Sequence, residues 1–198
     1  MLEWLHRKFR SQSPPQALRP EAPQPVVDKF LLRLHVVPDQ GEDFDIKACE
    51  RLLDVIRSKG ARTINDVFRM NIAVTIEDFF DGNRCKHSIA ANVEPPSPFD
   101  SAEAWAIHLK TIRARRDVHD VLIPISMIEP YEDNRLGSWP YADSIWVYSS
   151  LPLDKVATLL KPLRPDELRD ASQKDPDGTI VPPVPAPPGI TPYWVWWD

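Results

Sequence analysis

The sequence contains none of the short motifs that identify common enzyme classes. It has no G-x-S-x-G, no H-E-x-x-H and no H-x-E followed by P-C-x-x-C, and its six glycines leave little room for a phosphate-binding loop. The five histidines are scattered over different predicted elements, and none stands at a metal-ligand spacing from another. We therefore expect neither a bound metal ion nor a cofactor.

Cysteines and long apolar runs are also scarce. Cys49 and Cys85 form no C-x-x-C pair, which favours isolated buried thiols over the alternatives of a disulfide or a metal ligand. No apolar run approaches the roughly 20 residues of a membrane helix. The opening residues 1–9 have no apolar core of signal-peptide length. The sequence thus predicts a cytoplasmic protein without a transmembrane segment.

The charge is unevenly distributed along the chain. The formal net charge is -5, but residues 1–20 hold four basic residues against Glu3, so the remainder is near -8. A body this acidic repels the phosphate backbone of a nucleic acid. The charge therefore argues against a nucleic-acid partner and favours a basic protein partner.

Composition divides the chain into three parts. Residues 1–25 combine an amphipathic pattern, in which Leu2, Leu5 and Phe9 share one helical face and basic residues stand on other faces, with a spacer of five prolines. We interpret the pattern as a segment that docks on a partner or a membrane surface, or alternatively as a frayed terminus or a helix lying on its own domain. Residues 26–171 are predicted to form one domain, and residues 172–198 a Pro-rich tail that ends in four aromatic residues.

Periodicity and turn signals predict the order of elements in the first half of that domain. An apolar run at 29–37 predicts a strand, and residues 46–59 predict a helix that begins after Asp43 or Asp45 and stops at Lys59-Gly60. The alternation at 70–76, followed by Asp81-Gly82-Asn83 and a second apolar run at 88–93, predicts a hairpin over 69–93. We regard this hairpin as the nucleus of the sheet.

The second half continues the alternation of helix and strand. Asp100, with Glu103 three residues later, predicts the start of a helix over 100–116, and its basic end indicates helix termination or, alternatively, an oxyanion site. Strands are expected at 118–128 and 144–149, with Pro124 indicating an edge position or a bulge. A third helix starts near Pro152, and the terminal aromatics are expected to return as an edge strand or to fill a groove.

This order predicts an α+β fold. We expect a mostly antiparallel sheet with helices packed on one face, in which the first six elements form a ferredoxin-like split β-α-β core and the remaining strands extend it. Two strand-to-strand connections lack a helix, which argues against a doubly wound parallel sheet.

The polar tip of the predicted hairpin supplies the candidate catalytic residues. Glu77, Asp78 and Asp81, with His87, have the chemistry to hold a divalent cation or to supply a carboxylate base. Turn chemistry and protection of a sheet edge explain the same residues without catalysis. We favour a structural or partner-facing role for them and assign no catalytic residue.

Two stretches are predicted to bind a partner. The hairpin tip contributes Asp78, Phe80, Asp81 and Asn83, and the loop that follows the strand predicted at 118–128 contributes Trp139, Tyr141 and Asp143. Aromatic side chains beside charged ones are enriched in protein interfaces. The alternative for the loop is that its aromatics cover the open end of the sheet.

Three functional hypotheses follow from these features. The first is a non-enzymatic, cytoplasmic protein-binding module, immunity- or adaptor-like as in bacteria, that binds a basic partner through an acidic and aromatic surface. The second is a small metal-assisted hydrolase or transferase that uses the acidic hairpin. The third is a structural or regulatory subunit that docks through its N-terminal helix.

Overall fold

The structure is a computed structural model, and it describes residues 30–198 apart from 42, 92, 94–96 and 173–179. The expectations for the N-terminal amphipathic pattern and its spacer concern residues that lie outside the described part of the chain. Within the described residues, no helix is long and apolar enough to cross a membrane.

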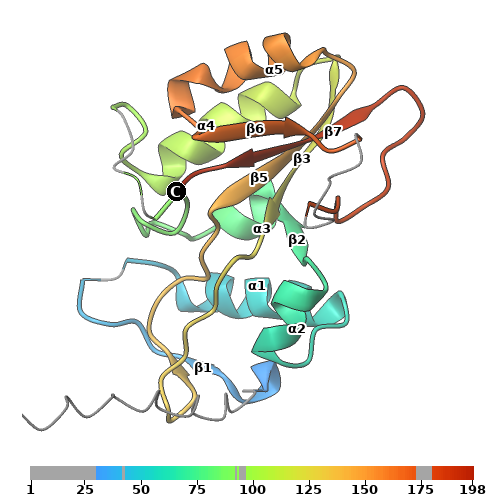
Figure 1. Cartoon of the computed structure of the whole chain (residues 1–198). Coiled ribbons are helices and arrows are strands. Elements are labelled where there is room, and N and C mark those ends of the chain that lie inside the picture. The colour runs from blue at the N-terminus through green and yellow to red at the C-terminus, as the bar shows by residue number, and fades with distance from the viewer. Residues whose placement is uncertain (1–29, 42, 92, 94–96, 173–179) are drawn as a thin grey trace, which may run out of the picture.

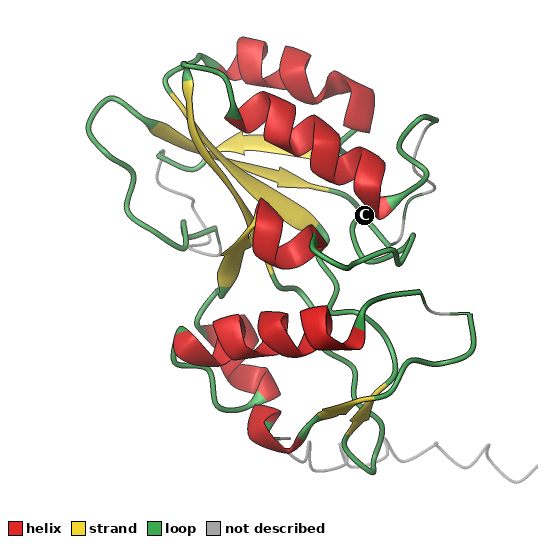
Figure 2. Cartoon of the chain, turned by 180° about the vertical axis from the view of Figure 1, so that it is seen from behind, coloured by secondary structure: helices red, strands yellow, loops and turns green. Residues whose placement is uncertain are grey.

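The main sheet runs antiparallel throughout, in the order β2-β3-β5-β7-β6 (Figure 1). Its strands are β2 (Ala73–Thr75), β3 (Val118–Pro124), β5 (Ser144–Ser149), β6 (Glu167–Asp170) and β7 (Thr191–Trp196). The helices α3 (Ile76–Phe80), α4 (Ala102–Arg113) and α5 (Leu153–Leu160) lie on one face of this sheet (Figure 2). The predicted α+β class, with a mostly antiparallel sheet, is confirmed.

The two faces of the sheet are buried by different partners. The face toward the helices carries Val121, Ile123 and Val147, which belong to the main hydrophobic core. The opposite face carries Leu122, Trp146 and Tyr148, and the chain around Ile180 and Ile190 packs over these side chains. Burial on both sides explains why all six positions of β5 are buried.

The remaining elements form a second layer beside the sheet. α1 (Ile46–Ser58) and α2 (Ile64–Arg69) lie next to a small parallel sheet of β1 (His35–Val36) and β4 (Arg135–Leu136), with the short 3-10 helix η1 (Leu31–Arg33) at the start (Figure 1). A second 3-10 helix, η2 (Lys161–Leu163), follows α5. The strand predicted at 29–37 is therefore mostly wrong, because only two of its residues are extended and they pair outside the main sheet.

The hairpin predicted over 69–93 is wrong. Thr75 ends β2 and caps α3: its side chain accepts a hydrogen bond from the backbone N–H of Asp78, and the Asp78 carboxylate accepts one from the Thr75 backbone. This reciprocal pairing begins a helix where the alternating pattern predicted a continuing strand. The helix also buries the consecutive residues Phe79 and Phe80, which an alternating strand does not do.

The second arm of that hairpin is absent as well. Among the described residues of 88–93, Ile89 makes an isolated parallel bridge to Ala142, and no strand is formed. Gly82, at a φ of +76°, lets the chain turn tightly against the first turn of α1. The Asp81-Gly82-Asn83 tripeptide is thus a turn that follows α3 and packs against the start of α1, and it does not connect two strands.

The ferredoxin-like assignment of the first six elements is wrong for the same reason. The structure instead contains a split β-α-β unit further along the chain. Since β5 and β6 each pair antiparallel with β7, they run parallel to each other, with α5 as their connection and β7 inserted between them. The terminal aromatic segment was expected to form an edge strand or to fill a groove, but it forms an interior strand of the main sheet.

Several predicted helices and strands are confirmed, with shifts at their ends. α1 begins after Asp45, whose side chain accepts the Ala48 N–H at 2.8 Å. α4 is capped by Ser101 rather than Asp100. β3 lies between β2 and β5, so the edge position inferred from Pro124 is wrong. Pro124 is the last residue of β3, where a missing N–H has the least effect on the ladder.

Candidate functional site

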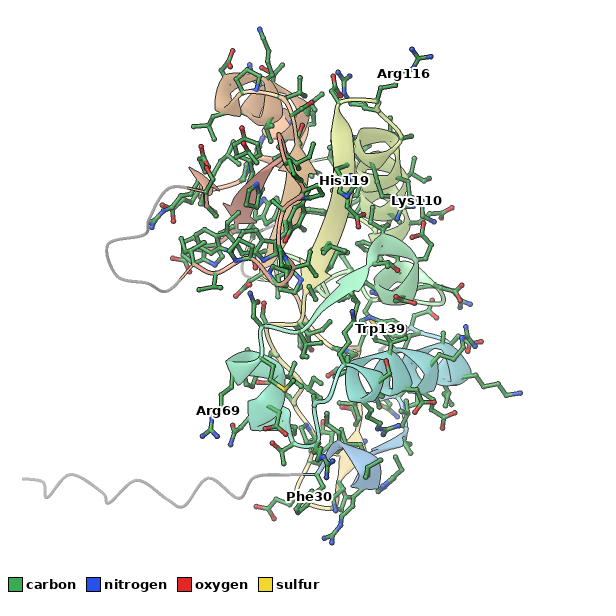
Figure 3. The ribbon with its side chains drawn as sticks, turned by 90° about the vertical axis from the view of Figure 1, so that its right-hand side faces the viewer. Phe30, Arg69, Lys110, Arg116, His119 and Trp139 are labelled. Carbon is green, nitrogen blue, oxygen red and sulfur yellow. The ribbon has the colours of Figure 1, made fainter. Side chains whose placement is uncertain are left out.

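A groove lies between α1, α3 and α4, on the side of the molecule from which Lys110 of α4 projects (Figure 3). Its volume is about 990 Å³. Leu52 and Val55 of α1, Phe80 of α3, and Ala106 and Ile107 of α4 give it an apolar floor. Ile107 is 59% exposed, which leaves its side chain available for contact.

Carboxylates outnumber cations around this floor. Asp54, Glu77, Asp78, Asp81 and Glu103 line the groove, against Arg51, Arg84 and Lys110. We call this combination of apolar floor and charged rim the acidic groove. It brings together the acidic residues singled out from the sequence and acidic residues of two helices that were not singled out.

Glu77 is held by Arg113, which comes from the end of α4. Arg113 donates from Nη1 to Oε2 at 2.7 Å and from Nη2 to Oε1 at 2.5 Å, the two-pronged geometry that fits a carboxylate. This pairing lowers the pKa of Glu77 below its ordinary value and raises the pKa of Arg113. Glu77 is therefore a stable anion and a poor general base near neutral pH.

The basic cluster at the end of α4, residues 113–116, contains a second arginine that is paired with a carboxylate. Arg115 donates from Nε and Nη2 to the two carboxylate oxygens of Asp117, each at 2.8 Å. Two arginines of the cluster thus already hold carboxylates. The arrangement supports helix termination rather than an oxyanion site for this cluster.

Asp78 and Asp81 have different roles in the groove. Asp78 is the acidic member of the cap of α3, so its carboxylate is engaged by the Thr75 hydroxyl at 2.8 Å. Asp81 pairs with Arg51 of α1 at 2.8 Å, and the two side chains are 71% and 59% exposed. An ion pair this exposed contributes about 0–1 kcal/mol, so Asp81 is free to exchange Arg51 for another cation.

Three of the predicted residues do not take part in the acidic rim. Phe80 is 7% exposed and packs edge-on against Phe79 at 5.0 Å. Asn83 is 4% exposed and donates to the Ser88 hydroxyl at 2.9 Å. Their predicted place at an exposed tip is corrected, because the tip is a buried helix end. His87 is exposed and does not line the groove.

The loop residues lie apart from the acidic groove. Trp139 is 1% exposed and packs edge-on against Phe44 at 5.7 Å, so it is a core residue and the prediction of an interface aromatic is corrected. Tyr141 is half-buried and pairs through its backbone with Met127. The Asp143 carboxylate accepts hydrogen bonds from the hydroxyls of Ser126 and Ser144. Asp143 lines a separate cavity at the end of the sheet.

The four candidate catalytic residues thus have four different environments. Glu77 is in an ion pair, Asp78 caps a helix, Asp81 stands at the groove rim and His87 is on the open surface. Across the described part of the chain, no three His, Cys, Asp or Glu side chains are grouped so as to hold a metal ion. Burial raises the pKa of the Cys49 thiol to about 12, so this cysteine is an inert core residue.

Sequence reasoning missed the two helical walls of the groove. Arg51, Asp54 and Val55 follow one another at helical spacing on α1, as do Glu103, Ile107 and Lys110 on α4. In each helix the predicted core stripe was correct, but the positions adjacent to it were not considered. An apolar Ile107 between Glu103 and Lys110 was the signal that marked the outer face.

The arrangement of sheet, helices and groove defines an α+β protein with an acidic surface groove built from three helices. Residues 47–195, which include every groove-lining residue and the main sheet except Trp196, match the family described as "Uncharacterized protein YfbO family", and the chain belongs to that family. It is similar to "Uncharacterized protein YfbO" of Escherichia coli (strain K12), with 29% identity over 151 residues, 75% of this chain and 97% of that protein. No solved structure matches the chain.

Proposed function

We propose that this chain is a non-enzymatic, cytoplasmic protein-binding module, immunity- or adaptor-like, whose acidic groove takes a basic amphipathic segment of a partner protein. The observation that supports the proposal is the combination of an apolar floor with a rim in which carboxylates outnumber cations. Helix-in-groove recognition uses this combination, since apolar anchors enter the floor while charges set orientation and approach.

The rim offers two carboxylates to an incoming cation. Asp81 is engaged only by the exposed Arg51, and Glu103 forms no ion pair within the described residues. They come from two different elements that line the floor, Asp81 after α3 and Glu103 in the first turn of α4. A basic partner segment that crosses the floor is therefore able to contact both without opening the Glu77–Arg113 pair.

The apolar floor supplies the affinity. Ile107 presents most of its side chain to solvent, and burying a side chain of this size contributes about 1.5–3 kcal/mol. Leu52, Val55 and Phe80 lie around it. We expect Ile107 to act on the dissociation rate and the rim carboxylates to act on the association rate.

The test compares three immobilised full-length proteins for capture of basic proteins from a bacterial extract. They are wild type, Asp81→Lys with Glu103→Lys, and Asp154→Lys. Asp154 is the matched control, since its side chain is 71% exposed, as is that of Asp81, but it lies on α5 outside the groove. We expect wild type and the control to capture the same basic protein and the double variant to lose it.

The captured protein is then purified and its binding rates are measured. We expect the double variant to associate about 10-fold more slowly at low salt, and Ile107→Asp to dissociate faster. Thermal melts of each variant check that the fold is intact. Equal capture by all three immobilised proteins contradicts a role for the acidic groove.

A further inference from the structure

We infer that the acidic groove is covered, in the full chain, by the chain's own N-terminal segment 2–10, which a basic partner segment has to displace. This inference rests on the proposed function of the groove. It identifies the resident occupant of the groove and adds regulation by competition to the binding activity.

The chemistry of the segment matches that of the groove. Leu2, Leu5 and Phe9 recur at the spacing of one helical face, and Arg7, Lys8 and Arg10 stand at the other positions. The groove provides an apolar floor and a rim with five carboxylates against three cations. The segment therefore presents the same two features, apolar anchors and positive charge, that the proposed partner requires.

The start of the described chain is linked to a groove residue through a side chain of α1. Arg57 of α1 donates from Nη2 to the carbonyl of Leu31 at 2.6 Å and from Nη1 to Oδ1 of Asp54 at 2.6 Å. Asp54 lines the groove. One arginine thus connects the start of the described chain to the rim. Phe30, the first described residue, lies at the α1 end of the molecule (Figure 3).

The remaining distance is short compared with the linker. From Arg57 to Ala48, the groove residue nearest the start of α1, the helix rises about 14 Å at about 1.5 Å per residue. Nineteen residues separate Arg10 from Phe30. At about 3.1 Å per residue, the spacing of a Pro-rich linker, nineteen residues reach up to roughly 60 Å. The tether is therefore long enough to bring the segment to the groove.

The comparison with relatives agrees with an accessory role for the segment. The family match begins at residue 47, so the segment and its linker precede the matched region. The similar Escherichia coli protein is covered over 97% of its length, while a quarter of this chain has no counterpart in the alignment. The groove-lining residues of α1, α3 and α4 lie within the matched region. The N-terminal segment thus lies outside the part of the chain that the family model matches.

Tethering makes even a weak contact effective. A tether that reaches its site gives the segment an effective concentration on the order of 1 mM. Against a segment dissociation constant of about 0.2 mM, this competition lowers the apparent affinity for a partner about sixfold. A partner that binds tightly displaces the segment, whereas weak basic proteins are excluded.

The experiment uses full-length protein labelled with ¹⁵N and carrying a nitroxide on an introduced cysteine, Ser11→Cys. Cys49 and Cys85 are buried, so the reagent modifies the introduced thiol. The measurement is the paramagnetic broadening of backbone amides. Ser172→Cys, an exposed position after β6 and outside the groove lining, provides the control label. Two variants of the Ser11→Cys chain are compared: Arg7→Glu with Lys8→Glu, and Arg19→Glu, whose altered residue lies outside the segment.

We expect the Ser11→Cys label to broaden amides of α1, α3 and α4 beyond the control label. The broadening should disappear in the Arg7→Glu, Lys8→Glu chain and persist in the Arg19→Glu chain. Absence of groove broadening, or broadening that survives the double charge reversal, overturns the inference. Broadening that appears when a nitroxide-labelled chain is mixed with a separate ¹⁵N chain also overturns it, because the occupant is then a second copy.

Different results would contradict the groove as a binding site and its coverage by the segment 2–10. Capture of a basic protein by wild type but not by the Asp81→Lys, Glu103→Lys chain supports the groove as a binding site whether or not the segment covers it. If the segment does cover the groove, the Arg7→Glu, Lys8→Glu chain binds the captured protein about sixfold more tightly than wild type. An unchanged affinity in that chain contradicts the competition even where capture succeeds.

Discussion

Replacement of Trp197 by alanine should remove a large part of the stability of the protein. Trp197 follows β7, is 1% exposed and lies with its ring 5.2 Å from that of Trp105 at an interplanar angle of 76°. Its Nε1 donates to the Leu163 carbonyl at 2.9 Å. One side chain therefore joins the end of the chain to α4 and to the end of η2.

The expected loss in the free energy of unfolding follows from these contacts. Truncation of a fully buried tryptophan costs about 3–5 kcal/mol, and the Leu163 carbonyl is left facing the cavity without its donor. We expect a loss of about 4 kcal/mol from a total that is typically about 5–15 kcal/mol. With a slope of about 2 kcal/mol per molar urea, the unfolding midpoint falls by about 2 M.

Trp196→Ala is the matched control for this measurement. Trp196 is the preceding residue, is only partly buried, and stacks on Trp194 at 6.0 Å on the opposite face of the sheet. We expect it to lose about 1–2 kcal/mol, since such an aromatic pair contributes about 0.5–1.5 kcal/mol beyond its buried area. Equal midpoints for the two variants in urea titrations followed by circular dichroism would refute the assignment of Trp197 to the core.

Two further predictions concern the turn and the ion pair next to the groove. Gly82→Ala should destabilise the protein by about 2–4 kcal/mol, because a Cβ at this position lies 2.4 Å from the Ala48 Cβ at a φ of +76°. Gly189→Ala, at a φ of +78° with nothing within 4 Å, should lose only about 1–2 kcal/mol in the same thermal melts, and similar losses for both would contradict the close approach of the turn to α1. Glu77→Gln should lower stability at pH 7 by about 1 kcal/mol or less, since the Glu77 side chain is about half exposed. Arg113 holds the pKa of Glu77 below its unfolded value of 4.5, so the stabilisation is present above pH 4.5 and is lost as the pH falls through the folded pKa. The urea midpoints of wild type and variant should therefore converge as the pH falls below 4.5, and a constant gap would show that the pair is not formed.

The acidic character of the candidate site was predictable from the sequence, but its geometry was not. Glu77, Asp78 and Asp81 were singled out together, and they do lie at one groove. Their partners come from distant parts of the chain, since Arg113 is 36 residues from Glu77 and Arg51 is 30 residues from Asp81. Sequence spacing carries no information about such pairs, because they form only when two separately folded helices are packed against each other.

Whether Trp139 is exposed or buried was likewise not predictable from the sequence. Trp139 was predicted at an interface or over the open end of the sheet, and it lies in the core against Phe44. The two residues are 95 positions apart. A tryptophan beside a proline and a tyrosine has the same local pattern in both settings, so the packing partner alone determines its role.

The sequence by itself determined those elements whose residues interact within one or two turns of the chain. α1 is set by its apolar spacing, by the Asp45 cap and by Gly60 after its end, and β5 by its run of buried apolar and aromatic residues. Only the tertiary structure decided which extended segments joined the main sheet. Residues 35–36 pair elsewhere, the described residues of 88–93 form no strand, and β7 enters between β5 and β6. Strand pairing depends on backbone partners that are remote in sequence, and the fold selects among them by the total apolar surface that each arrangement buries.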